Sequence, residues 1–444
     1  MIIMHRPSRP TAVGLMVLAW VTICAPAVAQ PPADPTTVLR CGRMLHVRTG
    51  TMERNAVLVV SNGRITASGA GAAEPAGAKV IDLSNSTCLP GLIDVHTHLL
   101  QNYSGRLGGD DPNMALTVTA LGTTRRALLG AAMGREDLEA GITTVRDLGN
   151  SGWNGDVALR DAIRNGWVAG PRIVASTRAL SAAGGQFGGL APEAQRLIEN
   201  EYVVISGVEE ARKAVRQAFY DGADVIKVIV NTGPRVISLD EMKVIVDEAA
   251  RVGRKVSAHA IGDLATRIAA EAGVASIEHA YTVPDDVLAM MARKNIFLVP
   301  TDYPAEDYLI IGGDAAMTPE QRRQAEQGAR GFAEASRTRT QRAIKAGVRI
   351  AFGSDEYYQF PNSTRGQSSL HTLRAYASAG MSPLDVIRTA TMNAAELLGM
   401  ESRIGGLEPG KFADVIAVPG DPLADLRLLE RVNFVMKDGK VVRQ

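Results

Sequence analysis

The amino-acid sequence predicts an α/β protein that combines a (β/α)₈ TIM barrel with a small β-sandwich domain formed from both chain ends. In the middle of the 444-residue chain, eight short apolar runs alternate with helical stretches, which is the pattern of repeated βα units. The two ends instead show short alternating strands and tight-turn sequences such as Asn62-Gly63 and Asp438-Gly439. We therefore expect the barrel at residues 89–404 and the split β-sandwich at residues 30–88 and 405–444.

The eight predicted barrel strands are short and rich in apolar residues, as buried strands usually are. They cover residues 91–95, 143–147, 172–175, 225–230, 256–260, 276–279, 296–300 and 350–353. Several predicted helices begin with capping sequences: Ser206 with Glu209, Ser238 with Glu241, and Thr318 and Ser382, each before a proline. An open doubly wound sheet is the alternative, but no glycine-rich phosphate-binding sequence follows the first strand.

The N-terminus has the pattern of a secretory signal at residues 1–29. Arg6 and Arg9 supply the positive region, residues 11–24 are mostly apolar, and Ala27-Val28-Ala29 is a typical cleavage site. A transmembrane anchor is the alternative, but the apolar stretch is too short to span a bilayer comfortably. A lipoprotein attached through Cys24 is a second alternative. We therefore expect an exported protein, periplasmic or secreted, with no stable membrane span once the signal is removed.

Two cysteines, Cys41 and Cys88, remain after the signal. An exported compartment permits a disulfide between them, whereas two separate buried thiols fit the sequence equally well, because spacing does not give their distance. The formal net charge is +1 and no basic block stands out. Nucleic-acid binding usually requires a concentrated basic face, so we expect no nucleic-acid partner.

Four of the seven histidines lie at or near the ends of predicted strands. His96 and His98 follow the first strand two residues apart, so their side chains point to the same side. His259 and His279 lie near the ends of the fifth and sixth predicted strands. Because the carboxyl ends of barrel strands build one active site, four imidazoles placed there are typical of a metal centre.

Lys227 interrupts the apolar run of residues 225–230. A buried ammonium is costly without a partner, and it has no lone pair with which to bind a metal. Reaction with CO₂ converts the amine into a carbamate, whose two oxygens can bridge two cations. Beside four histidines and an aspartate, Lys227 therefore indicates a carboxylated lysine in a two-metal site. A salt-bridged lysine at a strand end is the alternative.

Asp355 follows the eighth predicted strand. A carboxylate there can bind a metal and accept a proton from bound water, so Asp355 is the predicted catalytic residue. A helix N-cap is the alternative interpretation. Asp94 and Asp147 also lie near strand ends, where they suit supporting roles. Glu278 directly precedes one histidine and is expected to face the other side of its strand.

These residues closely resemble the amidohydrolase superfamily of metal-dependent hydrolases. The matching segments are Pro90-Gly91-Leu92-Ile93-Asp94-Val95-His96-Thr97-His98, Lys227, Ser257-Ala258-His259-Ala260, Glu278-His279-Ala280, Gly353-Ser354-Asp355 and residues 406–414. The resemblance covers nearly the whole chain after the signal.

The resemblance implies two divalent metal ions, usually Zn²⁺. It places His96, His98 and Asp355 on one metal and His259 and His279 on the other, with carboxylated Lys227 and a hydroxide bridging them. It further implies that the carboxylate of Asp355 takes the proton of the hydroxide and passes it to the leaving amine.

Within the superfamily, the chain resembles exported Xaa-Pro dipeptidases and carboxypeptidase-like enzymes, and enzymes that hydrolyse ochratoxin A, an aryl amide of phenylalanine. Residues 143–149 and 180–185 look like two strand-end loops of this branch. In the loop that contains residues 180–185, relatives often carry a histidine directly after the glycine pair, where this chain has Gln186. Gln186, Tyr103 or the metals themselves are the candidates for stabilising the carbonyl oxygen.

A substrate with a C-terminal carboxylate needs a cationic anchor. Arg178, Arg235 and Arg365 fall in or near predicted strand-end loops and are the candidates, although each also fits a solvated surface charge. We thus expect a hydrolase that cleaves the amide bond before the C-terminal amino acid of a dipeptide or N-acyl amino acid, with ochratoxin A among the candidate substrates.

The resemblance also implies a homo-oligomer.

Two alternative functions fit parts of the sequence. A cyclic-amide hydrolase or a deaminase of the same superfamily is the first alternative, and Lys227 argues against the deaminase, which usually has one metal and no bridging lysine. A non-catalytic scaffold with the same fold is the second, and the complete set of ligands argues against it.

Overall fold

The structure, a computed structural model, describes residues 36–101, 118–312, 317–357 and 360–444. The predicted signal at residues 1–29 and Tyr103 lie outside these residues. Among the described helices, none is both long and apolar enough to cross a membrane.

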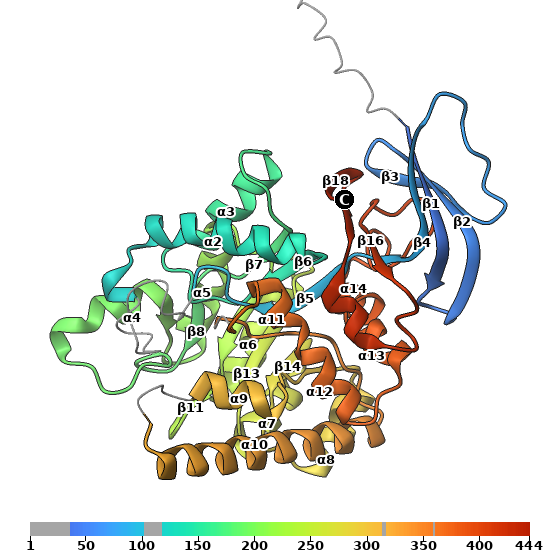
Figure 1. The fold of residues 1–444 in the computed structure, drawn as a ribbon. Helices are drawn as coiled ribbons and strands as arrows, with labels where there is room; N and C mark the ends of the chain where they lie inside the picture. The colour runs from blue at the N-terminus through green and yellow to red at the C-terminus, as the bar shows by residue number, and fades with distance from the viewer. Residues whose placement is uncertain (1–35, 102–117, 313–316, 358–359) are drawn as a thin grey trace, which may run out of the picture. The chain divides into compact units, whose positions relative to one another are not determined.

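Both ends of the described chain contribute to one seven-stranded sheet, coloured blue and red in Figure 1. The strand order is β18-β17-β16-β4-β1-β2-β3, in which β16 pairs antiparallel with β4, and β4 pairs parallel with β1. The strands are β1 Thr37–His46, β2 Thr51–Ser61, β3 Arg64–Gly69, β4 Lys79–Pro90, β16 Val415–Pro419, β17 Phe434–Lys437 and β18 Lys440–Arg443. Strand β4, from the first part of the chain, and strand β16, from the last part, therefore share backbone hydrogen bonds.

Cys41 of β1 and Cys88 of β4 form a disulfide, with Cα atoms 5.9 Å apart and a sequence separation of 47. Both cysteines are buried in one apolar cluster with side chains from β2, β3, β16 and β17, among them Leu58 and Phe434. The disulfide thus ties two parallel neighbours together inside the core that this sheet surrounds.

Parallel strands carry the middle of the chain. A three-stranded sheet has the order β5-β6-β7, and a six-stranded sheet has the order β15-β14-β13-β10-β8-β9. The strands are β5 Leu92–Thr97, β6 Ile142–Asp147, β7 Arg172–Ala175, β8 Ala179–Ser181, β9 Tyr202–Val204, β10 Ile226–Ile229, β13 Val256–Ala260, β14 Ser276–His279 and β15 Phe297–Val299; β11 Asn231–Thr232 and β12 Arg235–Val236 form a separate hairpin. Each of the first seven predicted barrel strands overlaps one of them. Most of these strands are buried at every residue, as expected when both faces of a parallel sheet are covered.

The eighth predicted strand, residues 350–353, does not form a regular strand. Isolated bridges join Ile350 to Leu298 of β15 and Glu356 to Thr97 of β5. The segment therefore lies between the two sheets but pairs only at single residues. The left-handed backbone of Asp355, with φ 54°, interrupts the ladder directly after it.

The third predicted strand has the bounds of β7, and a separate short strand, β8, follows it. Thr177 has a left-handed φ of 60°, which separates β7 from the short strand β8. β7 pairs with β6, whereas β8 pairs with Val228 and Ile229 of β10. The two pieces together connect the three-stranded sheet to the six-stranded sheet.

Helices follow most of the parallel strands. They are α2 Thr123–Glu139, α3 Gly155–Arg164, α4 Gln195–Glu201, α5 Val208–Tyr220, α6 Leu239–Ala250, α7 Asp263–Ala272, α8 Asp285–Arg293, α9 Ala305–Gly312, α10 Pro319–Lys345, α11 Arg365–Leu370, α12 Thr372–Ser378, α13 Pro383–Thr389 and α14 Met392–Leu398, with 3₁₀ turns at Pro192–Ala194 and Leu426–Arg431. The long helix α10 is prominent in Figure 1. The chain is thus a mixed α/β protein with parallel sheets.

Three of the four predicted helix starts are confirmed. Ser238 and Thr318 each form a capping box with the third helical residue, and Ser382 accepts a hydrogen bond from Asp385 N. The prediction for Ser206 is wrong. Helix α5 is preceded by Gly207, whose φ of 101° takes the N-cap position, so the serine lies one residue too early to cap it.

Candidate functional site

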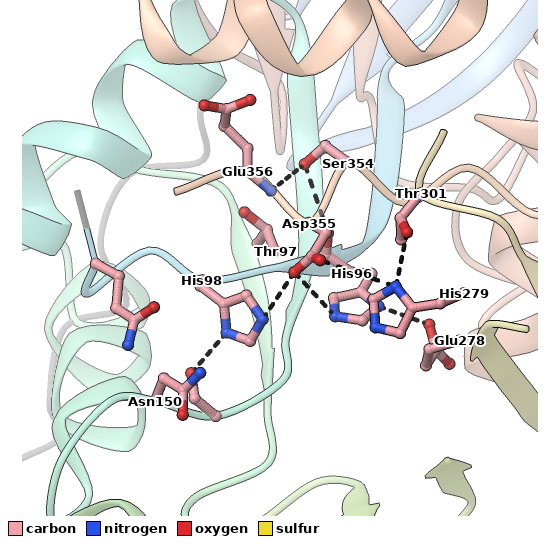
Figure 2. A network of polar contacts seen from close by, with 12 residues as sticks. His96, Thr97, His98, Asn150, Glu278, His279, Thr301, Ser354, Asp355 and Glu356 are labelled. Atoms are coloured by element: carbon pink, nitrogen blue, oxygen red, sulfur yellow. Dashed lines mark hydrogen bonds and ion pairs between the residues drawn. The ribbon is translucent and has the colours of Figure 1, made fainter. Parts of the chain in front are cut away.

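The six predicted metal ligands come together among the parallel strands, and Figure 2 shows four of them. The residues come from neighbouring strands: His96 lies near the end of β5 and His98 directly after it, Lys227 lies within β10, His259 near the end of β13, His279 at the end of β14, and Asp355 after residue 350. Short contacts between ring or charged atoms link them. All are buried except the carboxylate of Asp355, whose side chain is 19% exposed.

Asp355 lies at the centre of the histidines (Figure 2). One of its carboxylate oxygens is 3.1 Å from Nε2 of His98 and 3.4 Å from Nε2 of His96, and the other is 3.9 Å from Nδ1 of His279. Ligand atoms of Asp355, His96 and His279 all lie within 4.8 Å of one another. A single divalent cation can be reached by groups at such separations, since zinc ligands lie about 2.0–2.2 Å from the metal.

Lys227 is buried with its Nζ 3.5 Å from Nε2 of His96. Among the described residues, no carboxylate forms an ion pair with this amine, which removes the support for a salt-bridged lysine. Burial lowers the pKa of Lys227 to about 8, although the charges of Glu278 and Asp355 act in the opposite direction. The uncharged amine is the form that adds CO₂, so this environment fits a carbamate.

The two remaining histidines lie side by side, with the rings of His259 and His279 4.7 Å apart. Burial lowers the pKa of His259 to about 3, and it lowers that of His279 as well. Both imidazoles are therefore neutral at physiological pH, which is the form that binds metals.

In His98 and His279, hydrogen bonds determine which ring nitrogen is free to bind a metal. Nδ1 of His98 is 2.8 Å from the carbonyl oxygen of Gly149, which can only accept, so Nδ1 carries the proton. The hydroxyl of Thr301 donates to Pro300 O and therefore accepts from Nδ1 of His279, 2.7 Å away. In both rings the lone pair on Nε2 remains available to a metal.

Glu278 is the main residue whose placement the sequence did not predict. It was expected to face away from the site, but its carboxylate lies 2.8 Å from Nδ1 of His96. Glu278 also accepts hydrogen bonds from Ser257 Oγ (2.7 Å) and Arg146 Nη2 (3.0 Å). Glu278 and His279 are adjacent, and both reach the centre because His279 leaves the regular strand with a φ of 67°. The only signal in the sequence is that this glutamate adjoins a ligand.

Two further aspartates support the ligand segments, as predicted. Asp94 accepts hydrogen bonds from His96 N (3.0 Å), Ser354 N (3.1 Å) and Ser354 Oγ (2.6 Å), and so ties β5 to the segment that carries Asp355. Asp147 accepts from Leu99 N at 2.9 Å, which holds the backbone just after His98.

The candidate substrate-binding arginines make contacts within the chain. Arg235 donates to Ala183 O (2.6 Å) and Phe187 O (2.8 Å), and thereby holds the loop that carries Gln186. Arg178 donates to Glu199 O at 2.8 Å and lies over the Trp153 ring. Arg365 is buried and donates to Thr97 Oγ1 at 2.7 Å. The side-chain oxygen of Gln186 accepts from Tyr202 OH at 3.1 Å.

Arg178, Arg235 and Arg365 are therefore not solvated surface charges. Each is engaged with a carbonyl or hydroxyl of its own chain, a contact that sequence position does not reveal. Arg235 and Arg365 shape the loops near the histidines, whereas Arg178 lies half-buried beside an indole ring.

A sequence model of the amidohydrolase family matches residues 87–442. The chain belongs to this family. The ochratoxinase of Aspergillus niger is 32% identical to this amidohydrolase over 453 residues, which cover 94% of the chain and 88% of the relative.

Solved structures agree with this assignment. A Xaa-Pro dipeptidase with methionine bound in its active site is 29% identical, with a TM-score of 0.79, covering 92% of this chain and 100% of the other. A prolidase complexed with N-methylphosphonate-L-proline is 28% identical, with a TM-score of 0.80 and the same coverage. The amidohydrolase is therefore a hydrolase of amide bonds, and its family generally depends on a binuclear metal centre.

Proposed function

We propose that this amidohydrolase is an exported two-metal enzyme that cleaves the amide bond before the C-terminal amino acid of dipeptides and N-acyl amino acids. The observation that carries the proposal is the buried Lys227, whose Nζ lies 3.5 Å from a ring nitrogen of His96. A carbamate on Lys227, which would offer oxygens to two cations, would explain a lysine that lacks a carboxylate partner among the described residues and lies beside four imidazoles.

The residues fit two zinc ions in the arrangement that the sequence predicts. His96, His98 and Asp355 would hold one ion, His259 and His279 the other, and carboxylated Lys227 would contact both. When bound, the ions supply polarisation of the scissile carbonyl and a lower pKa for a water molecule. Asp355 would hold a proton on a carboxylate oxygen and deliver it to the leaving nitrogen. Its partial exposure, unlike the burial of the histidines, suits that role.

The substrate class rests on the relatives. One is an ochratoxinase, one binds methionine, and one binds a phosphonate derivative of proline. Both of these bound ligands are amino acids or derivatives of them, and ochratoxin A is an amide of phenylalanine. This supports a site that accepts an amino acid on the leaving side of the bond.

We also propose the finer architecture. The eight parallel segments would close as a (β/α)₈ barrel at residues 89–404, because strand pieces and isolated bridges connect the two parallel sheets at both edges. The seven-stranded sheet would wrap around one apolar cluster as a small β-sandwich, with residues 30–88 and 405–444. Cleavage of a signal after Ala29 and assembly into a homo-oligomer belong to the same proposal.

A substrate screen tests this function. Zinc-loaded enzyme is incubated with dipeptides, N-acyl amino acids of varied C-terminal residue, ochratoxin A and a set of cyclic amides, and the products are identified by mass spectrometry. Release of the C-terminal amino acid is expected. Turnover of the cyclic amides alone would replace the proposal by the cyclic-amide hydrolase, and full activity with about one metal per chain would exclude the two-metal centre.

A further inference from the structure

Arg339, in the middle of α10, is a buried cation with unused hydrogen-bond donors. Its side chain is 2% exposed, and neither Nε nor Nη1 has a hydrogen-bond partner among the residues that the structure describes. Nη2 donates to Asp302 Oδ1 at 2.5 Å and to Pro300 O at 3.5 Å. Leaving a buried charged donor unsatisfied is costly, so such a group calls for a partner such as a water molecule, an ion or a ligand.

Tyr281 connects this arginine to the metal ligands. The Tyr281 ring lies 5.5 Å from the ring of His279, and the guanidinium carbon of Arg339 lies 5.8 Å from the centre of the same ring. Tyr281 and Arg339 together line a cavity of about 620 Å³ between α10 and the loop that follows β14. The Tyr281 ring therefore lies next to both the ring of His279 and the guanidinium, and a ligand that extends from His279 to the arginine has to pass along this ring.

We propose that Arg339 binds the carboxylate of the amino acid that leaves the substrate. This inference rests on the proposed function, because it assigns the residue that recognises the C-terminal carboxylate. One residue spans about 3.3–3.6 Å, and a charge-assisted hydrogen bond adds about 2.8 Å. The two lengths add to about 6 Å, so the donor that binds this carboxylate lies about 6 Å beyond the scissile carbonyl, and Nη1 of Arg339 is that donor.

Other arginines near the site are less suited to this role. Arg178, Arg235 and Arg365 already donate to groups of the chain, as described above. Arg342 lies one turn further along α10 and lines the same cavity, but it is paired with Asp285 and Val283 O. Within the part of the chain that the structure describes, Arg339 combines burial, free donors and proximity to a ligand histidine.

A purely structural role is the rival explanation. Arg339 contacts Pro300 O and Asp302, and Thr301 between them binds Nδ1 of His279. Loss of the arginine could therefore disturb His279 and slow every substrate equally. The test must separate recognition of a carboxylate from general damage to the site.

The experiment compares N-benzoyl-L-phenylalanine with N-benzoyl-L-phenylalaninol, which has the same amide bond and a neutral hydroxymethyl group. In the zinc enzyme, Arg339→Gln should lower kcat/KM for the acid by about 100-fold, mainly through KM, because one charge-assisted contact is lost. The same variant should change kcat/KM for the alcohol by less than about threefold. Arg339→Lys should fall between the two, since it keeps the charge but not the guanidinium geometry.

Two control variants bracket this result. Arg337→Gln removes an exposed cation from the same helix, outside the lining of this cavity, and should leave both substrates unchanged. Thr301→Ala removes the hydroxyl beside Nδ1 of His279 and should affect the acid and the alcohol to the same extent. If Arg339→Gln keeps the wild-type ratio of acid to alcohol, the assignment is overturned. If Arg339→Gln does not fold, the ratio in Arg339→Lys decides in the same way.

Calorimetric binding of L-phenylalanine and L-phenylalaninol separates this inference from the proposed function. An enzyme that cleaves no amino-acid amide, yet binds L-phenylalanine about tenfold more weakly after Arg339→Gln, would refute the function and retain the carboxylate site. An enzyme that cleaves the acid, with binding and turnover insensitive to Arg339, would retain the function and refute the site.

Discussion

Glu278 holds His96 through a buried contact of 2.8 Å between a carboxylate oxygen and Nδ1. The same carboxylate is paired with the buried guanidinium of Arg146. One glutamate therefore orients a predicted metal ligand and neutralises a charge that burial would otherwise penalise.

Replacing Glu278 by Gln should weaken metal binding. The amide cannot match the carboxylate as an acceptor, and we expect zinc affinity to fall about 10–100-fold, the usual effect of losing such a supporting group. Competition with a chelator measures the affinity. Glu334→Gln, on the exposed side of α10, is the matched control and should have no effect. Unchanged zinc affinity in Glu278→Gln would show that His96 needs no carboxylate partner.

Lys227→Ala should remove the bridge between the two metal positions. We expect bound zinc to fall below two per chain and kcat/KM to drop by at least about 100-fold, because second-metal chemistry contributes several kcal/mol. Metal analysis and turnover of the best substrate measure both effects. In the wild type, ¹³C-labelled bicarbonate should give a protein-bound carbamate signal that the variant lacks. Lys243→Ala, an exposed lysine on α6, is the control.

The metal-free protein should become more stable at alkaline pH because of Lys227. Burial lowers the pKa of this amine from 10.5 to about 8. The unfolded chain therefore binds more protons between these values, so the penalty is fully present below pH 8 and disappears as the pH rises to 10.5.

A Lys227→Met variant lacks that penalty. The free energy of unfolding of the wild type, relative to the variant, should rise by about 3 kcal/mol between pH 7 and pH 10.5. Urea denaturation of both metal-free proteins across this range measures the difference. Parallel pH profiles for the two proteins would mean that the amine is not desolvated.

Reduction of the disulfide between Cys41 and Cys88 should destabilise the protein. For a sequence separation of 47, the loss of chain constraint corresponds to about 4 kcal/mol. Thermal unfolding with and without reductant measures the change, and a Cys41→Ser, Cys88→Ser double variant should already be destabilised and insensitive to reductant. A wild type with the same melting temperature in both conditions would contradict this expectation.

The parallel strands could be predicted because their signal is local. Runs such as residues 225–230 and 296–300 are apolar almost throughout, and the structure forms β10 and β15 within them. The segment at residues 350–353 is just as apolar, but its end is set by the backbone of Asp355, which must turn toward three histidines. That constraint comes from tertiary contacts, and hydrophobic pattern alone does not express it.

The gathering of the predicted ligand residues and the supporting places of Asp94 and Asp147 could also be predicted, whereas the other supports could not. His96 and Lys227 are unusual residues in their own segments and are visible at once. The role of Glu278 depends on a residue 182 positions away, and the contacts of Arg235 end on backbone carbonyls, which every residue has. Sequence therefore reveals which residues are chemically unusual, and the structure reveals which charges are already satisfied.

The sheet shared by both chain ends has a consequence for the order in which the protein is built. Strand β4 cannot gain its neighbour β16 until more than 300 further residues have been synthesised, because the pairing joins Pro90 to Val415. During that interval one edge of a largely apolar sheet is unprotected. The disulfide between β1 and β4 closes within the first 88 residues and can hold the early half of the sheet together until the last strands arrive.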